Sequence, residues 1–256
     1  MKQTIVIAPR YSRLEPLIRS IAADGVPSDA VEVYHARNTV YALTAADGTR
    51  LSIKDFHAPS AINALVYTRL RKSKARRSYE NARRLIDMGF DTPDPVAYIE
   101  IHQGARLTRS YYICLQIDHT EDLRLWHQRD AAAMSPVLDS LAQYMVRLHR
   151  AGVYHKDFSP GNILYRDEDG TLHFYLIDIN RMRFGVYSHN TLMNNFSRID
   201  IESADATRDL ARRYAHAAGI DPEATAADAA RSLDKYHRSK RRHRFIKQLF
   251  KRQPHH

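Results

Sequence analysis

The sequence has few of the features that mark secreted, disulfide-bonded or membrane-spanning proteins. Its 256 residues include one cysteine, Cys114, so the chain forms no internal disulfide and no cysteine metal cluster. A reducing compartment is the natural inference, and the apolar run around Cys114 indicates a buried strand residue. No stretch approaches the roughly 18 continuous apolar residues of a transmembrane helix. The apolar run before Pro9 is too short for the core of a secretory signal.

Acidic charge is also in short supply. The chain carries 39 Lys and Arg against 29 Asp and Glu, a formal net charge of +10. This surplus favours a polyanionic partner, which could be nucleic acid, an anionic membrane or a phosphorylated glycolipid. The length suits one bilobal domain or two small ones with a buried core.

Glycine is missing where a phosphate-binding loop would need it. Alternating residues and tight turns predict three antiparallel strands over residues 31–35, 39–44 and 50–54. The turn between the first two, His35 to Asn38, contains no glycine, although a glycine-rich loop lets backbone N–H groups approach phosphates closely. Any cover over phosphates must therefore be short or built differently, and Arg37 and Asn38 could contribute side-chain donors.

The most informative stretch runs from His155 to Arg181. Asp157 is followed five residues later by Asn162, and then two predicted strands joined by a polar turn lead to Asp178. Phosphoryl transfer needs such a set, with one Asp to orient a hydroxyl and an Asn and a second Asp to hold metal on the phosphates. Taken singly, these residues are equally typical of turns. Their combined spacing favours a kinase-type catalytic loop.

Two further candidates lie upstream of this stretch. Lys54 ends the third predicted strand, where a kinase places the lysine that pairs with nucleotide phosphates, although an isolated strand lysine is usually solvated. Glu80 lies on a helix predicted over residues 74–88, where the helix glutamate that pairs with this lysine is expected. The alternative for Glu80 is an i,i+4 surface partner of Arg76 or Arg84.

These elements predict an α+β, bilobal, protein-kinase-like fold. Residues 1–118 would form an antiparallel-sheet N-lobe, and residues 119–256 a small, mainly helical C-lobe. Further helices are expected at 61–70, from a Ser135 cap with Pro136 to His149, at about 202–218 and at 222–250, and a hairpin at 96–101 and 111–117. The segment from Met182 to Ile199 is expected to be a short activation or substrate segment without the Ala-Pro-Glu of protein kinases.

The sequence resembles the Kdo/WaaP lipopolysaccharide kinase family of the protein-kinase-like superfamily. The resemblance rests on HKDFSPGNIL, on LIDINR and on the run RKSKARRSYENARRLIDMGFDTPDPVAYIE, and it covers roughly residues 30 to 200. It implies ATP-dependent phosphorylation of a sugar, Kdo or heptose, in the lipopolysaccharide inner core. It also implies a cytoplasmic enzyme, peripheral at the inner membrane of a Gram-negative bacterium.

The resemblance implies a role for each candidate residue. Asp157 matches the catalytic base, and Asn162 and Asp178 match the Mg²⁺ ligands. Lys54 matches the lysine that pairs with the ATP phosphates, and Glu80 matches its partner. Lys156 stands where many kinases have an arginine beside the base.

Two basic segments favour an anionic acceptor. Lys235 to Arg252 holds nine Lys or Arg and no acid, with an apolar stripe of Phe245, Ile246, Leu249 and Phe250. This stripe could dock on the C-lobe, or the segment could lie on an anionic membrane surface. Arg69 to Arg84 carries eight bases against Glu80 alone, and it could meet lipid A-type phosphates or be a solvated helix face. Nucleic acid is a weaker prediction, because aromatic residues do not interleave with the bases.

Two alternatives to a lipopolysaccharide sugar kinase stay open at this point. One is a RIO-like kinase of proteins or small molecules, which would not need the basic tail. The other is a pseudokinase scaffold, favoured by the absent glycine-rich loop and disfavoured by the presence of Lys54, Asp157, Asn162 and Asp178.

Overall fold

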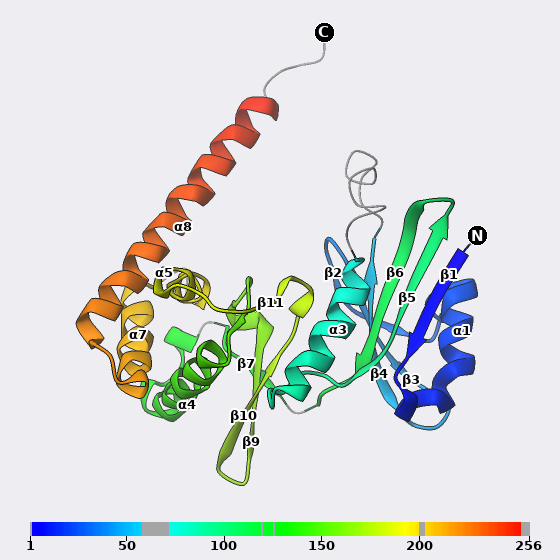
Figure 1. Cartoon of the computed structure of the whole chain (residues 1–256), viewed down its shortest axis with the longest axis horizontal. Coiled ribbons are helices and arrows are strands. Elements are labelled where there is room, and N and C mark those ends of the chain that lie inside the picture. Colours follow the sequence, from blue (N-terminus) through cyan, green and yellow to red (C-terminus); the bar gives the residue numbers. More distant parts are fainter. Residues whose placement is uncertain (1, 58–71, 119, 125, 200–202, 252–256) are drawn as a thin grey trace. The chain divides into compact units, whose positions relative to one another are not determined.

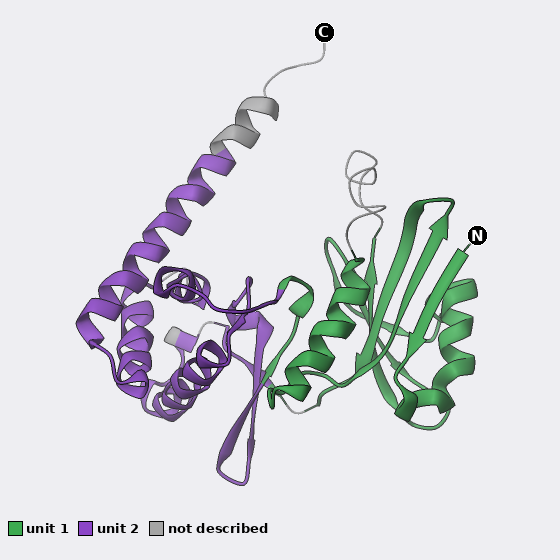
Figure 2. Cartoon of the chain, viewed as in Figure 1, with its two compact units in different colours: residues 1–120, 175–181 green, residues 121–174, 182–256 purple. Residues whose placement is uncertain are grey.

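A computed structural model describes residues 2–57, 72–118, 120–124, 126–199 and 203–251, without the side chains of residues 127 and 245–251. The chain forms two compact units (Figure 2). Unit 1 comprises residues 1–120 and 175–181, and unit 2 comprises residues 121–174 and 182–256. The sequence predicts one division after residue 118, whereas here a short segment from beyond that point completes unit 1.

Unit 1 is built on a six-stranded antiparallel sheet with the order β1-β5-β6-β4-β3-β2 (Figure 1). The strands are β1 (Lys2–Ile7), β2 (Val31–His35), β3 (Thr39–Thr44), β4 (Arg50–Phe56), β5 (Pro95–Gln103) and β6 (Arg106–Leu115). The three strands predicted around residues 31–54 and the later hairpin are all present. The mixed architecture confirms the predicted α+β class.

Residues alternate across β4 as the sequence predicts. Leu51 and Ile53 are fully buried in the core, and Lys54 between them and Phe56 is only partly covered. Cys114 on β6 is a buried, free cysteine, as expected. Burial raises the pKa of its thiol to about 12, so it stays protonated and unreactive near neutral pH.

Helices cover parts of this sheet. A 3-10 turn (η1, Pro9–Leu14) leads into α1 (Glu15–Asp24), which packs on β1 and β5. Helix α3 (Lys74–Asp87) packs on β4, β5 and β6, and Tyr79 lies against Tyr98 with ring centroids 5.4 Å apart. Ser73 caps α3 by accepting a hydrogen bond from the backbone N–H of Arg76. The helix predicted at 61–70 lies outside the described residues.

Unit 2 is mainly helical. Its helices are α4 (Ala131–Arg150), α5 (His189–Met193), α6 (Phe196–Ile199), α7 (Ala204–Ala218) and α8 (Pro222–Lys251), with 3-10 turns η2 (Trp126–Gln128) and η3 (Pro160–Asn162). Its strands are β7 (Glu121–Asp122), β8 (Val153–Tyr154), β9 (Ile163–Glu168), the first part of β10 (Thr171–Leu176) and β11 (Arg183–Phe184). The end of β10 and the turn η4 (Ile179–Arg181) belong to unit 1.

Helix α4 begins one turn earlier than the sequence predicts. Its N-cap is Asp130, whose side chain accepts hydrogen bonds from the backbone N–H groups of Ala132 and Ala133, and not Ser135. Pro136 therefore lies inside the helix, and Ser135 accepts a hydrogen bond from Arg213 of α7. The predicted cap is wrong because Asp130 offers an equally good cap a turn upstream.

Helix α8 changes character along its length. Near its start it packs on α7 and α6, with Ala226, Ala229 and Leu233 buried. From Asp234 to Arg244 every side chain is exposed or only partly covered. The C-terminal part of α8 extends away from the other helices of unit 2 (Figure 1).

Candidate active site

Unit 1 brings two of the predicted residues together. Lys54 lies on β4 opposite Tyr112 of β6, and its Nζ donates to Oδ1 of Asp178 over 2.5 Å. The Lys54 side chain is 20% exposed and that of Asp178 is 33% exposed. Residues 124 positions apart in the chain thus form one partly buried ion pair.

The end of β10 places Asp178 in unit 1. Tyr175 forms a parallel bridge with Asp91, and the backbone N–H of Leu176 donates to the Asp91 carbonyl over 3.1 Å. The Thr92 hydroxyl donates to the Leu176 carbonyl over 2.7 Å, and Leu176 is fully buried. These bonds fix the backbone two residues before Asp178.

Helix α3 holds the backbone on the other side of Asp178. Asn81 donates to the carbonyl of Ile179 over 2.7 Å, and Arg77 donates to the carbonyl of Asn180 over 2.9 Å. The Asn180 side chain in turn donates to Oδ1 of Asp178 over 2.7 Å. Asp178 itself adopts φ 52°, a left-handed conformation that Asp tolerates better than most residues. The carboxylate is therefore oriented by a tight turn that is bonded on both sides.

Glu80 does not pair with Lys54 in this structure. It accepts hydrogen bonds from Lys72 over 2.7 Å and from Arg76 over 2.9 Å, and Lys54 pairs with Asp178 instead. This corrects the expected Lys54–Glu80 pair in favour of the i,i+4 surface alternative. The physical reason is that the basic residues of α3 and its N-terminal flank reach Glu80 first. Desolvation raises the pKa of Glu80, but its bonds to Lys72 and Arg76 outweigh that and lower it overall.

Lys74 adds a second lysine beside the Lys54–Asp178 pair. Its Nζ donates to Oδ1 of Asn38 over 3.3 Å, and it lies 5.5 Å from the centroid of the Phe56 ring, at the same distance as Lys54. Burial, and then the nearby charge of Arg37, lowers the pKa of Lys74. Lys54 adds to this repulsion, and Asp178 partly offsets it. A bound anion would relieve the local surplus of positive charge.

In unit 2, the loop of residues 155–162, which follows β8, has its backbone held by its own side chains. The N–H of Asp157 donates to Nδ1 of His155 over 3.1 Å, and the Asn162 amide donates to the Asp157 carbonyl over 2.9 Å. His155 is almost fully buried, so its ring is held in place as it accepts the bond from Asp157. Asn162 makes its bond with its amide nitrogen, so its Oδ1 can still accept a hydrogen bond or bind a cation.

A buried chain of hydrogen bonds anchors this loop to the helices of unit 2. Asn195 donates from Nδ2 to the His155 carbonyl over 2.8 Å, and its Oδ1 lies 3.0 Å from Nε2 of His149. Nδ1 of His149 lies 3.0 Å from the Tyr214 hydroxyl. Because Oδ1 of Asn195 only accepts, Nε2 of His149 carries the proton and Nδ1 accepts from Tyr214. Burial lowers the pKa of His149 and raises that of Tyr214, so both side chains stay neutral.

The side chain of Asp157 is held separately by Arg198 of α6. Nη1 of Arg198 donates to Oδ1 of Asp157 over 2.6 Å, and both side chains are 31% exposed. Among the described residues, no donor bonds to Oδ2 of Asp157. One carboxylate oxygen is therefore anchored, and the other remains available as an acceptor.

The donors present suit a hard divalent cation. Asp178 of unit 1 offers a carboxylate oxygen, and Asn162 of unit 2 offers an amide oxygen. Both are oxygen ligands of the kinds that Mg²⁺ accepts when substrate phosphates complete its shell. Within the described part of the chain, no group of three or more His, Cys, Asp or Glu forms a metal cage. Each of the two residues, taken by itself, is of a type that suits a metal shared with a phosphorylated substrate.

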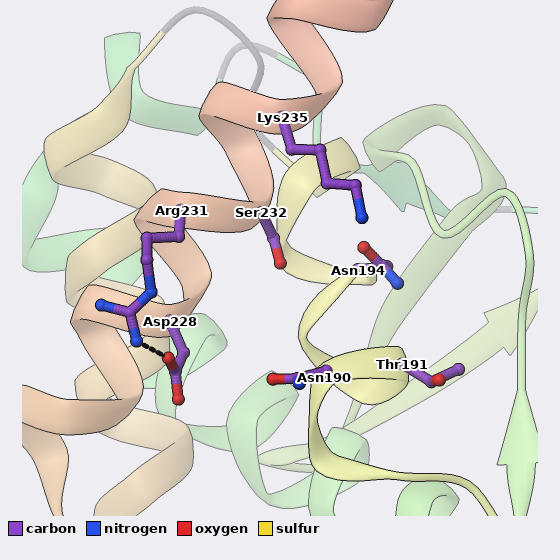
Figure 3. Close-up of a pocket in the computed structure, with 7 residues that line it drawn as sticks. All are labelled: Asn190, Thr191, Asn194, Asp228, Arg231, Ser232 and Lys235. Atoms are coloured by element: carbon purple, nitrogen blue, oxygen red, sulfur yellow. Dashed lines mark hydrogen bonds and ion pairs between the residues drawn. The ribbon is translucent and has the colours of Figure 1, made fainter.

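Unit 2 also contains a polar cavity of about 340 Å³ between α5 and α8 (Figure 3). Its walls are Asn190, Thr191, Asn194, Asp228, Arg231, Ser232 and Lys235. Asp228 pairs with Arg231 and with His189, so part of the charge is neutralised. None of the predicted site residues lines this cavity. Two of the wall residues directly precede residues near Asp157, however. Asn194 precedes Asn195, which bonds to the His155 carbonyl, and Lys235 precedes Tyr236, whose ring lies against Arg198.

The basic segment Lys235–Arg252 is helical as far as Lys251. Its apolar stripe, Phe245 to Phe250, lies outside the described side chains, so docking of that stripe stays a prediction. Among the described residues, no helix is both long and apolar enough to cross a bilayer.

Sequence reasoning missed four residues around the two carboxylates. They are Lys74 in unit 1, and His149, Asn195 and Arg198 in unit 2. Lys74 and His149 lie in helices that the sequence predicts. Lys74 belongs to the basic run, and His149 ends a helix with an apolar face. Asn195 and Arg198 lie in an irregular segment, where periodicity gives no indication of which side chain faces inward.

Comparisons with known proteins bear on the fold and the family of the chain. No curated protein matches the chain. A structure of WaaP in complex with acyl carrier protein matches with a TM-score of 0.64 and 18% identity, over 93% of this chain and 98% of that one. The amicoumacin kinase hAmiN in complex with AMP-PNP, Ca²⁺ and Ami matches with a TM-score of 0.57 and 14% identity, over 87% and 84%. At these identities the two structures support the kinase-like fold alone.

The family model of the lipopolysaccharide kinase (Kdo/WaaP) family matches residues 37–236. That span includes β3 to β6, both ion-paired carboxylates, the buried histidine network and the first half of α8. The chain therefore belongs to the lipopolysaccharide kinase (Kdo/WaaP) family and is an ATP-dependent phosphotransferase.

Proposed function

We propose that this kinase transfers the γ-phosphate of ATP to a hydroxyl group of a sugar, Kdo or heptose, in the lipopolysaccharide inner core. The observation that carries the proposal is the state of Asp157. Its Oδ1 is anchored by Arg198, and its Oδ2 has no donor among the described residues. A carboxylate held in this way can accept the proton of a sugar hydroxyl, as a general base requires.

Lys54 and Lys74 are the proposed contacts of the nucleotide phosphates. Both ammonium groups lie near Asp178, and the repulsion between them falls when an anion binds. The two side chains would replace part of the cover that backbone N–H groups supply in a glycine-rich loop. A side-chain cover accounts for a turn between β2 and β3 that lacks glycine.

Asn162 and Asp178 are the proposed ligands of Mg²⁺. When bound, the metal neutralises charge on the β- and γ-phosphates and so favours attack by the hydroxyl. Asp178 is supported by the tight turn that orients it, and Asn162 by the hydrogen bond that engages its amide nitrogen and not its oxygen. The contribution of the chain is then mainly positioning and electrostatics.

The enzyme is proposed to bind its acceptor at the cytoplasmic face of the inner membrane of a Gram-negative bacterium. The exposed basic residues of α8 between Lys235 and Arg244 support this, because each cation close to an anionic surface contributes about 1 kcal/mol. The partner would be the lipopolysaccharide core or a lipid A-type glycolipid.

Transfer of labelled phosphate from ATP tests the acceptor class. Purified lipopolysaccharide, casein and a set of soluble alcohols are offered separately, and the variant Asp157→Asn serves as the inactive control. Lipopolysaccharide is expected to be labelled, and mass spectrometry of its released core sugars identifies Kdo or heptose. Label in casein or in a soluble alcohol, with none in lipopolysaccharide, would refute the proposal in favour of the RIO-like or small-molecule alternative.

A vesicle assay tests the membrane contact. Removal of residues 241–256 should weaken binding to vesicles that contain anionic lipid and leave weak binding to neutral vesicles unchanged. The cut falls after Lys240 so that the shortened chain keeps the contacts of Tyr236 with Lys240 and with Arg198. Equal binding by the shortened and the full chain would contradict the membrane proposal.

A further inference from the structure

Arg198 connects the carboxylate of Asp157 to the C-terminal helix. Its guanidinium carbon lies 5.1 Å from the centroid of the Tyr236 ring, while Nη1 bonds to Asp157. Tyr236 belongs to α8, and Lys240 of the same helix lies over the same ring, also at 5.1 Å. The order of contacts is therefore α8, then α6, then the loop that carries the base.

The side chain and the backbone of Asp157 are fixed by different elements. The backbone is held within the loop by His155 and Asn162, and the buried chain through Asn195 ties that loop to α4 and α7. The side chain is held by Arg198 alone among the described residues. The rotamer of Asp157 therefore depends on the position of Arg198. This matters because catalysis by positioning is sensitive to small displacements of the base.

We propose that Arg198 is a positioning residue that sets the orientation of the Asp157 carboxylate, and that Tyr236 of α8 holds Arg198 in place through its ring. The proposal rests on the proposed function of Asp157 as the base. A guanidinium held against an aromatic face keeps its donors in a fixed plane. Arg198 can then anchor Oδ1 and leave Oδ2 directed to the acceptor. The basic helix thereby contributes to catalysis as well as to the surface charge.

Substitution of Arg198 tests the first part. Arg198→Gln should lower kcat about 10-fold or more, since one hydrogen bond between charged groups is lost, while KM for ATP and the melting temperature stay close to wild type. Arg198→Lys should restore part of kcat, because an ammonium group supplies the charge without the planar fork. The matched control is Arg208→Gln on α7, which removes an arginine that pairs with Asp205 on the surface. Wild-type or higher kcat in Arg198→Gln would overturn the proposal.

Substitution of Tyr236 tests the second part. Tyr236→Leu removes the ring and should lower kcat about 2- to 5-fold, the range of an exposed cation–π contact, and Tyr236→Phe should restore it. In the double variant Arg198→Gln with Tyr236→Leu, kcat should equal that of Arg198→Gln, because Tyr236 acts only through Arg198. Multiplied losses in the double variant would show independent roles and overturn the link.

Two shortened chains separate this link from membrane binding. With a delipidated core oligosaccharide as a soluble acceptor, removal of residues 241–256 should leave kcat unchanged. Removal of residues 235–256 should lower kcat as Tyr236→Leu does, and equal activity of the two shortened chains would overturn the proposal. The variant Asp157→Asn distinguishes the two hypotheses. If it stays active, the proposed base is wrong, whereas an inactive Asp157→Asn beside a fully active Arg198→Gln refutes only the role of Arg198.

Discussion

Each unit holds one of the two candidate catalytic carboxylates against a basic side chain, and these two pairs are built differently. In unit 1, Lys54 extends from a central strand to Asp178, whose turn is bonded on both sides. In unit 2, Arg198 of a four-residue helix bonds to Asp157 and packs against the ring of Tyr236. The first pair is fixed by sheet register and the second by contacts between helices. The unit 1 pair should therefore tolerate changes elsewhere, while the unit 2 pair should respond to changes in α8.

The largest expected effect comes from breaking the unit 2 pair at its carboxylate. Asp157→Asn should lower kcat by roughly 10²- to 10⁴-fold, the range for loss of a general base, with little change in melting temperature. The stability change is small because about a third of both side chains is in contact with solvent. Steady-state phosphate transfer to lipopolysaccharide measures kcat. An unchanged kcat would remove Asp157 from the mechanism.

Breaking the unit 1 pair at its lysine should have the next largest effect. Lys54→Met should lower kcat/KM for ATP roughly 10- to 100-fold, because one charged contact with phosphate contributes about 1.5–3 kcal/mol. Stabilisation of the fold by Mg·ATP in a thermal shift should fall in parallel. Lys2→Met, an exposed lysine on β1, is the matched control. Nucleotide stabilisation equal to wild type in Lys54→Met would contradict the assignment.

The buried network behind the unit 2 pair should make stability depend on pH. Burial lowers the pKa of His149 below its ordinary value of 6.5, so below that pH the unfolded chain binds a proton more readily than the folded one. Unfolding free energy should fall as the pH falls below 6.5, by at most about 1.4 kcal/mol per pH unit from this residue. Urea titrations of wild type and His149→Gln, compared at each pH, isolate this contribution. Parallel curves for the two proteins would argue against it.

The smallest expected effect belongs to Glu80. Since it pairs with Lys72 and Arg76 at the surface, Glu80→Gln should change kcat/KM for ATP by less than about threefold, as for other surface pairs. The same assay as for Lys54→Met applies. A loss as large as that of Lys54→Met would mean that Glu80 moves to Lys54 when nucleotide binds, and would restore the pairing that the sequence suggests.

Much of unit 1 could be predicted because its sequence is regular. Alternation across β4 correctly predicted that Leu51 and Ile53 are buried and that Lys54 is not. The kinase-type reading of Asp157, Asn162 and Asp178, which rests on their spacing, stays a prediction. The partner of Lys54 could not be predicted in the same way. Two acids, Glu80 and Asp178, were available, and only tertiary packing decides which lies within reach.

The surroundings of Asp157 were harder to predict. Asn195 and Arg198 lie 38 and 41 residues beyond it in a segment of short helices, where no periodic pattern identifies the inward side chains. His149 matched an apolar helix face, and its polar contacts depend on Asn195 and Tyr214, which come from other elements. Residues that act through such networks are set by the packing of several segments and not by their local sequence.

The segment 175–181 has a consequence for how the protein is made. Without it, Thr92, Asn81 and Arg77 of unit 1 each lose a carbonyl group to which they donate, and the buried Leu176 and Ile179 leave space in the core. Chains emerge from the ribosome N-terminus first, and domains that are contiguous can fold as they appear. Unit 1 cannot be completed in that way, because its last segment ends at residue 181. By then residues 121–174 of unit 2 have already been synthesised. Unit 1, which contains Lys54 and Asp178, is therefore completed only after Asp157 of unit 2 has been synthesised.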